Sequence, residues 1–353
     1  MFCTMISQGG SLKHYITLFC AIACSGGALA QEALPAAAAS VDTAGSTEAP
    51  VQNILVVGQR PGPALWKVSK GDHLLWVFGT YSPLPKNMVW RSQEVENALA
   101  QSQEILGEPG SKMQVGWASS FNLLTAAPFM IGLKDNADGA HLQDVVPADV
   151  YARWSVLRTK YMGDDKRIES QRPMFAASGL FTKALAANGM DRGLAIPARI
   201  EELAKNWKIR QTSTTVMVDL DNPREAVRDF KKAQLNDLDC FTKTVDRLEG
   251  DLDAMKLRAN AWSLGDINAI RKLNFPDQKK SCNAAILDSK WLSSLKNGGD
   301  LQQRIKLNWI VSAEKSLASN KSTFAMLPMW DLLDPQGLVA ALRAKGYQVD
   351  EPE

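Results

Sequence analysis

The sequence predicts an α/β protein whose mixed sheet is built from strands near both ends of the chain, with a long helical insertion between them. Two observations favour this class. On the N-terminal side, two apolar runs, a helical segment and a third run ending on a carboxylate follow in β-β-α-β order; on the C-terminal side, a buried-type run, a helical segment and a short run follow in β-α-β order. The predicted strands are residues 64–68, 74–78, 104–108, 322–327 and 347–349.

The middle of the chain, about 140–310, shows mainly helical spacing. Its most regular pattern runs from Phe241 to Trp262, where apolar residues recur at alternating steps of four and three. This pattern predicts one helix of roughly six turns whose apolar seam packs against the core. Other helices are expected over 147–161, 175–187, 197–207, 301–317 and 336–345, and a strand over 214–218.

Polar side chains follow two of the predicted strands. Ser82 lies just beyond the strand that ends in Gly79-Thr80, and Glu108 closes the next strand. Ligands collect outside the carboxyl ends of strands in open α/β sheets. We therefore expect Ser82 and Glu108 to lie at one candidate site.

The composition is that of an ordinary globular protein. The chain has 353 residues, a formal net charge of +2 and 45% hydrophobic residues. A charge this close to zero argues against nucleic acid as a partner. The expected partner is an unidentified small molecule or a peptide.

Residues 1–30 read as a signal peptide. Lys13 and His14 precede an apolar run of about ten residues, which is too short to span a membrane, and small residues end at Ala30. Cleavage after Ala30 would place the protein in the periplasm or outside the cell. The alternative is a lipoprotein anchored at Cys24. Residues 31–60 read as a flexible leader, and no later run is long and apolar enough for a transmembrane helix.

Two cysteines, Cys240 and Cys282, lie beyond the signal peptide. In an oxidising compartment such a pair predicts one disulfide. The alternative is two buried free thiols.

The chain resembles the TraB/GumN family, which is similar to the TIKI metalloproteases and the erythromycin esterases. Matching features at the N-terminal end are Leu65-Trp66, Gly79-Thr80, Leu84-Pro85 and Glu108, and Asp334-Pro335-Gln336-Gly337-Leu338 resembles the family's turn near the C-terminus. The resemblance implies one family domain over 61–353. It also implies a hydrolase site that uses two strand-end histidines and a glutamate, with a divalent metal or a general base.

Both family histidines are replaced in this sequence. Ser82 stands at the first position and Asp331 at the second. Only His73 and His141 remain beyond the signal peptide, and neither occupies a family position. Serine cannot replace histidine as a base near neutral pH.

Three alternatives remain open. In the first, the site has lost its catalytic residues, and the protein is a binding or regulatory relative of the family's enzymes. Alternatively, Glu108 and Asp331, with Ser82 as a neutral ligand, form an oxygen site for Mn, Mg or Ca that keeps a metal-dependent hydrolase active. In the third, the pocket binds a small molecule without reaction, between aromatic walls supplied by Trp66, Trp76, Tyr81, Trp90 and Trp330.

Arg304 is a candidate anion clamp for the same pocket, although solvation on a helix surface explains it equally. The sequence thus predicts an exported TraB/GumN-like protein with a degenerate hydrolase site and no certain cofactor.

Overall fold

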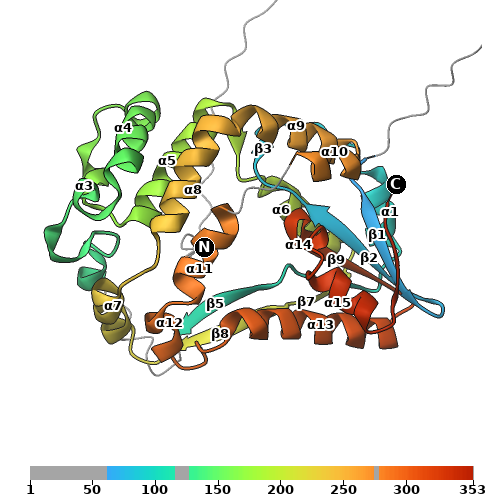
Figure 1. The fold of residues 1–353 in the computed structure, drawn as a ribbon. Coiled ribbons are helices and arrows are strands. Elements are labelled where there is room, and N and C mark those ends of the chain that lie inside the picture. Colours follow the sequence, from blue (N-terminus) through green and yellow to red (C-terminus); the bar gives the residue numbers. More distant parts are fainter. Residues whose placement is uncertain (1–61, 116–126, 274–277, 353) are drawn as a thin grey trace, which may run out of the picture. The chain divides into compact units, whose positions relative to one another are not determined.

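The computed structural model describes residues 62–115, 127–273 and 278–352, and its centre is a six-stranded mixed sheet (Figure 1). The strand order is β10-β1-β2-β9-β4-β7. The strands are β1 (Leu65–Lys70), β2 (His73–Thr80), β4 (Glu104–Leu106), β7 (Arg210–Thr212), β9 (Ser322–Pro328) and β10 (Gln348–Asp350). β1 and β10, the first and last strands along the chain, are neighbours in this sheet. The expectation of one mixed sheet built from both chain ends is therefore confirmed.

In this sheet β1 runs opposite to the other five strands. β1 pairs antiparallel with β2 through a tight turn at Gly71, whose φ of +61° suits glycine, and β10 pairs antiparallel with β1. β2, β9, β4 and β7 then run parallel. Because they are parallel, their carboxyl ends meet at a single edge of the sheet.

β9 is the central strand, and it reads as a continuous apolar run because it is covered on both faces. Residues 323–328 are all buried, and β9 contacts both α1 (Gln93–Ala100) and α13 (Leu301–Ser319). α6 (Ala195–Asn206) packs on α1, and α15 (Leu338–Ala344) packs on α13. Burial on both faces is what a parallel strand requires.

A separate helical core lies beside the sheet (Figure 1). It is formed by α4 (Ala148–Met162), α5 (Pro173–Ala187) and α8 (Leu238–Gly250), around the fully buried Trp154 and Phe241. α11 (Gln278–Leu287) packs on α8 and is joined to it by the Cys240–Cys282 disulfide. The predicted disulfide is therefore present in the structure.

The single helix expected from Phe241 to Trp262 is wrong. The chain forms two helices, α8 and α9 (Leu252–Ser263), which are separated at Asp251, where φ is −119° and ψ is 0°. Gly250 weakens the helix there, and the Asp251 carboxylate pairs with both Arg247 and Arg258. The apolar spacing continues through the break, and so the sequence pattern does not reveal it.

The expected strand over 214–218 is observed as β8 (Thr215–Leu220). It pairs in parallel with β5 (Gly110–Val115) in a separate two-stranded sheet. The remaining elements are β3 (Leu84–Pro85), η2 (Ala127–Met130), η3 (Ala137–Gly139), α3 (Leu142–Val145), η4 (Lys166–Ser170), β6 (Met190–Asp191), α7 (Pro223–Lys232), α10 (Ile267–Lys272), α12 (Lys290–Ser294) and α14 (Met329–Leu332).

Three expectations from the sequence fall outside the described residues: the signal peptide over 1–30, the alternative lipid anchor at Cys24, and the leader over 31–60. Among the helices that are described, none combines the length and apolar character needed to cross a membrane.

Candidate functional site

The candidate site lies at the edge where β2, β9 and β4 end. Thr80, the last residue of β2, is in register with Pro328, the last residue of β9, and Leu106 at the end of β4 pairs with Ala325. Ser82, Asp331 and Glu108 each follow one of these strand ends by two or three residues. The topology therefore brings three segments that are far apart in sequence to one edge of the sheet.

Thr80 and Glu108 are in direct contact. The Thr80 hydroxyl donates a hydrogen bond to Glu108 Oε1 over 2.5 Å, and its oxygen lies 3.3 Å from the carbonyl oxygen of Leu327. One hydroxyl proton serves one strong bond, and the shorter distance assigns it to the carboxylate. The bond ties the end of β2 to the residue that follows β4.

Gly79 allows the short helix α14 to pack close to this edge. A Cβ at residue 79 would lie 2.6 Å from Met329 Cε and 3.0 Å from Leu332 Cδ1. The carbonyl oxygen of Gly79 accepts a 2.7 Å hydrogen bond from Trp262 Nε1 on α9. The glycine in the Gly79-Thr80 motif is thus explained by packing, and the threonine by its bond to Glu108.

Asp331 is held by the backbone of the following helix. Its side chain is on α14 and only 8% of the residue is exposed. Oδ1 accepts a 3.3 Å hydrogen bond from the amide of Leu338 at the start of α15. Burial raises the pKa of Asp331 to about 6, and the charge of Asp334 adds to this, against the opposing effects of the Leu338 amide, Lys306 and Lys279.

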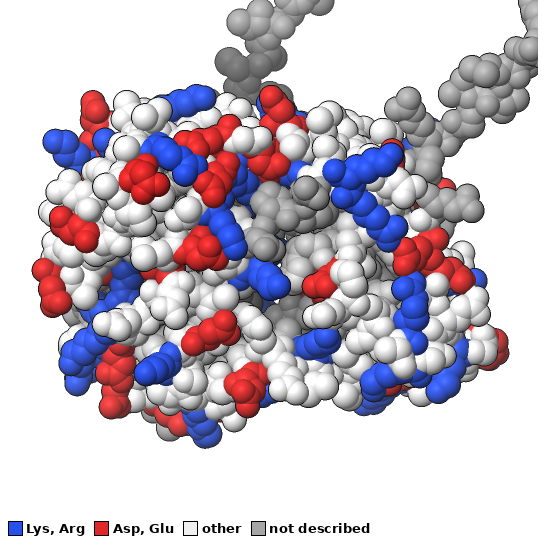
Figure 2. All heavy atoms as spheres, viewed as in Figure 1, with Lys and Arg blue, Asp and Glu red and all other residues white. Residues whose placement is uncertain are grey.

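Lys279, on α11, supplies a positive charge to the same edge. Glu108 and Asp331 both stabilise its ammonium electrostatically, and Nζ lies 5.4 Å from the centre of the Trp330 ring. Desolvation lowers the pKa of Lys279, and the nearby Arg247 adds to that effect. Lys279 is solvent-exposed. Figure 2 shows acidic and basic side chains interspersed over the face of the molecule that is viewed in Figure 1.

A buried polar network supports the candidate site from the helical side. Arg258 is fully buried, pairs with Asp251 and donates from Nε to the Tyr81 hydroxyl over 3.1 Å. Arg247 donates from Nη1 to Gln278 Oε1 over 2.9 Å, one residue before Lys279. Tyr81, a candidate wall of the pocket, is itself buried, and burial raises the pKa of its hydroxyl. These contacts fix the positions of the loop after β2 and of the first turn of α11.

The other sequence candidates are placed less centrally. Ser82 is exposed, and within the described residues it has no hydrogen bond to Glu108 or Asp331. Arg304 donates to the carbonyl oxygen of Asn297. Trp330 is 40% exposed and faces Lys279, whereas Trp66 is buried in the main core. Their roles in binding remain predictions.

The donors at this edge do not fit a divalent metal. In the described part of the chain, no three His, Cys, Asp or Glu side chains form a group that could hold an ion. One Asp331 oxygen is engaged by Leu338, and both carboxylates attract the Lys279 ammonium, whose positive charge opposes a second cation. His73 lies at the opposite end of β2, and His141 precedes α3 in the helical half.

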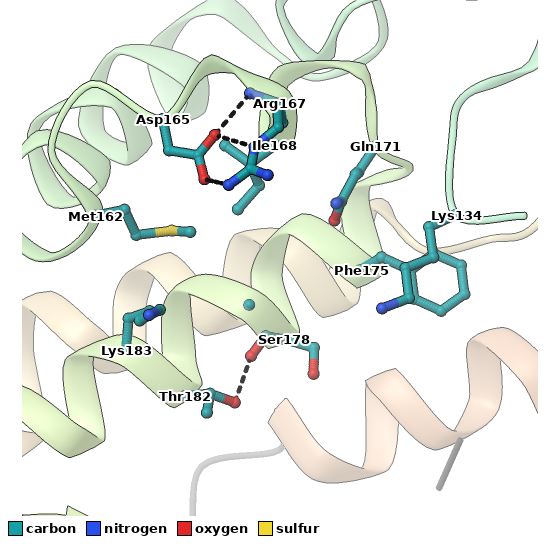
Figure 3. A pocket seen from close by; sticks show the side chains of 11 residues that line it. Lys134, Met162, Asp165, Arg167, Ile168, Gln171, Phe175, Ser178, Thr182 and Lys183 are labelled. Atoms are coloured by element: carbon teal, nitrogen blue, oxygen red, sulfur yellow. Dashed lines mark hydrogen bonds and ion pairs between the residues drawn. The ribbon is translucent and has the colours of Figure 1, made fainter. Parts of the chain in front are cut away.

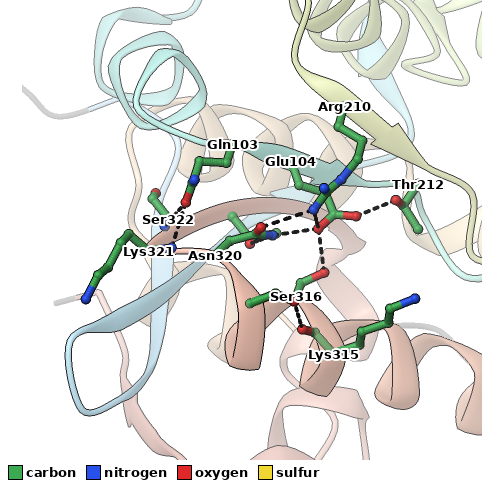
Figure 4. Close-up of polar contacts among 11 residues, drawn as sticks. Gln103, Glu104, Arg210, Thr212, Lys315, Ser316, Asn320, Lys321 and Ser322 are labelled. Carbon is green, nitrogen blue, oxygen red and sulfur yellow. Dashed lines mark hydrogen bonds and ion pairs between the residues drawn. The ribbon is translucent and has the colours of Figure 1, made fainter.

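The amino ends of the same strands carry a different polar cluster (Figure 4). Glu104, at the start of β4, is 5% exposed and accepts hydrogen bonds from four side chains. Arg210 Nη2, Ser316 Oγ and Asn320 Nδ2 lie 2.8, 2.9 and 2.6 Å from Oε2, and Thr212 donates to Oε1. Desolvation alone would raise the pKa of Glu104, but these hydrogen bonds lower it to about 2.

Sequence reasoning missed Lys279 and the roles of Thr80 and Glu104. Lys279 sits in Gln278-Lys279-Lys280, which reads as a solvated helix face, and its partners are about 50 and 170 residues away along the chain. The Gly79-Thr80 motif was the only usable signal for Thr80. Long-range contacts of this kind leave no local pattern.

Comparison with known proteins gives one match. The model of the TraB/PrgY/gumN family matches residues 64–351. No curated protein and no solved structure matches the chain at a significant level.

Proposed function

Because this chain belongs to the TraB/PrgY/gumN family but has Ser82 and Asp331 where the family resemblance predicts histidines, we propose that it is a non-catalytic member that binds a small polar molecule or peptide at the strand edge. The observation that carries this proposal is Lys279. Its ammonium lies over the ring of Trp330, next to Asp331 in the chain, and is attracted by the charges of Glu108 and Asp331. A positive charge at this edge opposes the binding of a metal ion there.

The strand edge offers complementary groups for a small polar ligand. Lys279 can donate to a carboxylate or another acceptor, and Glu108 can accept from an ammonium or a hydroxyl. The exposed part of Trp330 provides a flat apolar surface beside Lys279. A ligand with an anionic group and a donor group, such as an amino acid or a short peptide, matches this arrangement.

The absence of a suitable base supports binding rather than hydrolysis. Asp331 titrates near pH 6 but is buried and capped, and Ser82 has no base placed beside it among the described residues. Glu108 already accepts the Thr80 hydroxyl and faces a lysine. A general base must reach the proton that it abstracts, and both carboxylates of this edge already accept a hydrogen bond from the protein.

Ligand screening with two matched lysine variants tests the proposal. Thermal shift against amino acids and short peptides should find a stabilising ligand for the wild type. Lys279→Met and Glu108→Gln should lose that shift, whereas Lys280→Met, the same change one residue along α11, should keep it. An equal loss in both lysine variants would contradict the proposal.

Metal content separates the proposal from the alternative hydrolase. The purified protein, equilibrated with Mn²⁺, Mg²⁺ or Ca²⁺ and then desalted, should retain no stoichiometric metal and cleave no peptide. Stoichiometric metal that disappears in Glu108→Gln, together with peptide hydrolysis, would establish instead the rebuilt oxygen-ligand hydrolase.

We also propose export from the cytoplasm. The Cys240–Cys282 disulfide supports an extracytoplasmic location, because such bonds rarely persist in the cytosol. Mass spectrometry of the cell-derived protein should find Gln31 as the first residue. A lipid-modified Cys24 would show that the lipoprotein alternative holds.

A further inference from the structure

The helical half of the protein has a cavity of about 490 Å³ that the strand-edge site does not use. Figure 3 shows its lining, which comes from the end of α4, from η4 and from the outer face of α5, with Lys134 at one side. Its volume falls in the range of small-molecule sites. Its lining includes none of the strand-edge residues Glu108, Lys279 and Asp331.

The floor of this cavity is apolar. Ile168 on η4 is 4% exposed, and it faces Phe175 on α5 across the cavity, with Met162 at the far side (Figure 3). Phe175 is only partly buried. An apolar ligand group placed here would cover hydrocarbon that now faces water.

The rim carries an excess of positive charge. Lys134 lies beside Phe175, and Lys183 lies toward Met162 at the other side (Figure 3). Within the described residues, neither ammonium has a hydrogen bond or an ion pair. The one carboxylate in the lining, Asp165, is neutralised by Arg167, whose Nε and Nη2 lie 2.9 and 2.8 Å from its oxygens.

A further cation stands next to the lining. Arg192 donates from Nη2 to Ser178 Oγ over 3.1 Å and to Thr182 Oγ1 over 3.2 Å. Both hydroxyls belong to the cavity wall. The local field is therefore that of an anion site with an apolar floor.

Gly179 leaves one position of the cavity wall without a side chain. It lies inside α5, where glycine costs about 1 kcal/mol relative to alanine. A Cβ at this position would lie 3.4 Å from Ile168 Cδ1, at ordinary contact distance, so steric exclusion does not require glycine. A longer side chain would extend into the space between α5 and Ile168.

We propose that this cavity binds an amphipathic organic anion, with its hydrocarbon part on Ile168 and Phe175 and its carboxylate at Lys183 or Lys134. The combination of an apolar floor, two unpaired lysines and a neutralised aspartate selects against cationic and against purely polar ligands. The inference is independent of the proposed strand-edge function.

Calorimetry with octanoate on the full chain tests this assignment. Octanoate should bind saturably, whereas octanol and octyltrimethylammonium, which have the same tail, should bind more weakly. Replacing both lysines, Lys134→Met with Lys183→Met, should weaken octanoate binding by about fivefold to tenfold. Lys166→Met, on η4 but outside the lining, should leave octanoate binding unchanged. Lys279→Met, at the strand-edge site, should also leave it unchanged.

A second pair of variants addresses the shape of the cavity. Gly179→Leu should abolish octanoate binding while the protein stays folded by circular dichroism, and Gly179→Ala should retain most of it. Equal binding of octanol and octanoate, no effect of the lysine changes, or loss of binding only in Lys279→Met would each overturn the assignment.

Discussion

Two glutamates of one short stretch, Glu104 and Glu108, have opposite environments. Glu104 begins β4, is 5% exposed and accepts four side-chain hydrogen bonds (Figure 4). Glu108 follows β4, is half-buried and accepts one such bond, from Thr80, beside the cation of Lys279. The three residues between them span the sheet from its amino edge to its carboxyl edge.

The difference separates a carboxylate that holds the fold together from one that is available to a ligand. At the amino edge the four donors around Glu104 come from β7, from α13 and from the residue that follows α13, so the charge is satisfied inside the protein. At the carboxyl edge Glu108 is partly exposed, and its second carboxylate oxygen accepts no hydrogen bond within the described residues. Perturbed titration alone does not mark function here, because the residue with the lowered pKa is the structural one.

Removing Glu104 should have the largest effect. Glu104→Ala leaves four donors without their acceptor and should lower the free energy of unfolding by about 4 kcal/mol in urea titrations. Because the pKa of Glu104 is about 2 in the folded state against an ordinary 4.5, its contribution is complete above pH 4.5 and lost as the pH falls through about 2. The free energy of unfolding of Glu104→Gln, which keeps one acceptor, should fall between those of Glu104→Ala and the wild type. Equal stability of Glu104→Ala and the wild type would show that Glu104 does not hold the fold together.

Removing the disulfide should cause the next largest loss of stability. The loss should affect α11, which carries Lys279, and not the surroundings of Glu104. Cys240 and Cys282 are 42 residues apart, and Cys240→Ser with Cys282→Ser should cost about 3 kcal/mol. Since the bond anchors α11, hydrogen exchange should increase in residues 278–287 and remain unchanged around Glu104. Uniformly faster exchange in both regions would show that α11 is not a separate unit.

Ionisation of Asp331, at the carboxyl edge, should lower the stability of the folded state as the pH rises. Its pKa is raised from 3.8 to about 6 by burial, so the folded state holds the proton more tightly and stability falls as the pH rises through this range. Asp331→Asn, which keeps an acceptor for the Leu338 amide, should be more stable than wild type by up to about 2 kcal/mol at pH 7.5 and equal to it near pH 3.5. Thermal unfolding of both proteins from pH 3.5 to 7.5 measures the difference; parallel curves would contradict the raised pKa.

Glu108 should have the smallest effect on stability. Glu108→Gln loses one partly exposed contact and should change the free energy of unfolding by less than about 1 kcal/mol. It should nevertheless lower the pKa of Lys279 further, because an attractive charge is removed. NMR titration of the Lys279 side chain measures that pKa shift. If Glu108→Gln loses as much stability as Glu104→Ala, both glutamates hold the fold together and the contrast between them is wrong.

The fold class could be predicted because apolar runs and helical spacing at the two chain ends reflect burial directly. The Cys240–Cys282 pair and the strand-end positions of Ser82 and Glu108 followed from equally local signals. The break at Asp251 could not be predicted, because the apolar seam continues across it while two distant arginine pairings stabilise the break. The role of Glu104 was hidden for a similar reason, since its donors come from β7, α13 and the segment before β9.

The sequence by itself determined the sheet-forming ends and the family of the chain, and it has Ser82 and Asp331 where the family resemblance predicts histidines. Only the tertiary structure decided that Lys279 occupies that edge and that Asp331 is capped by the backbone. The physical reason is that burial and periodicity are properties of consecutive residues, whereas the charge at a site is the sum over side chains that folding brings together from separate segments.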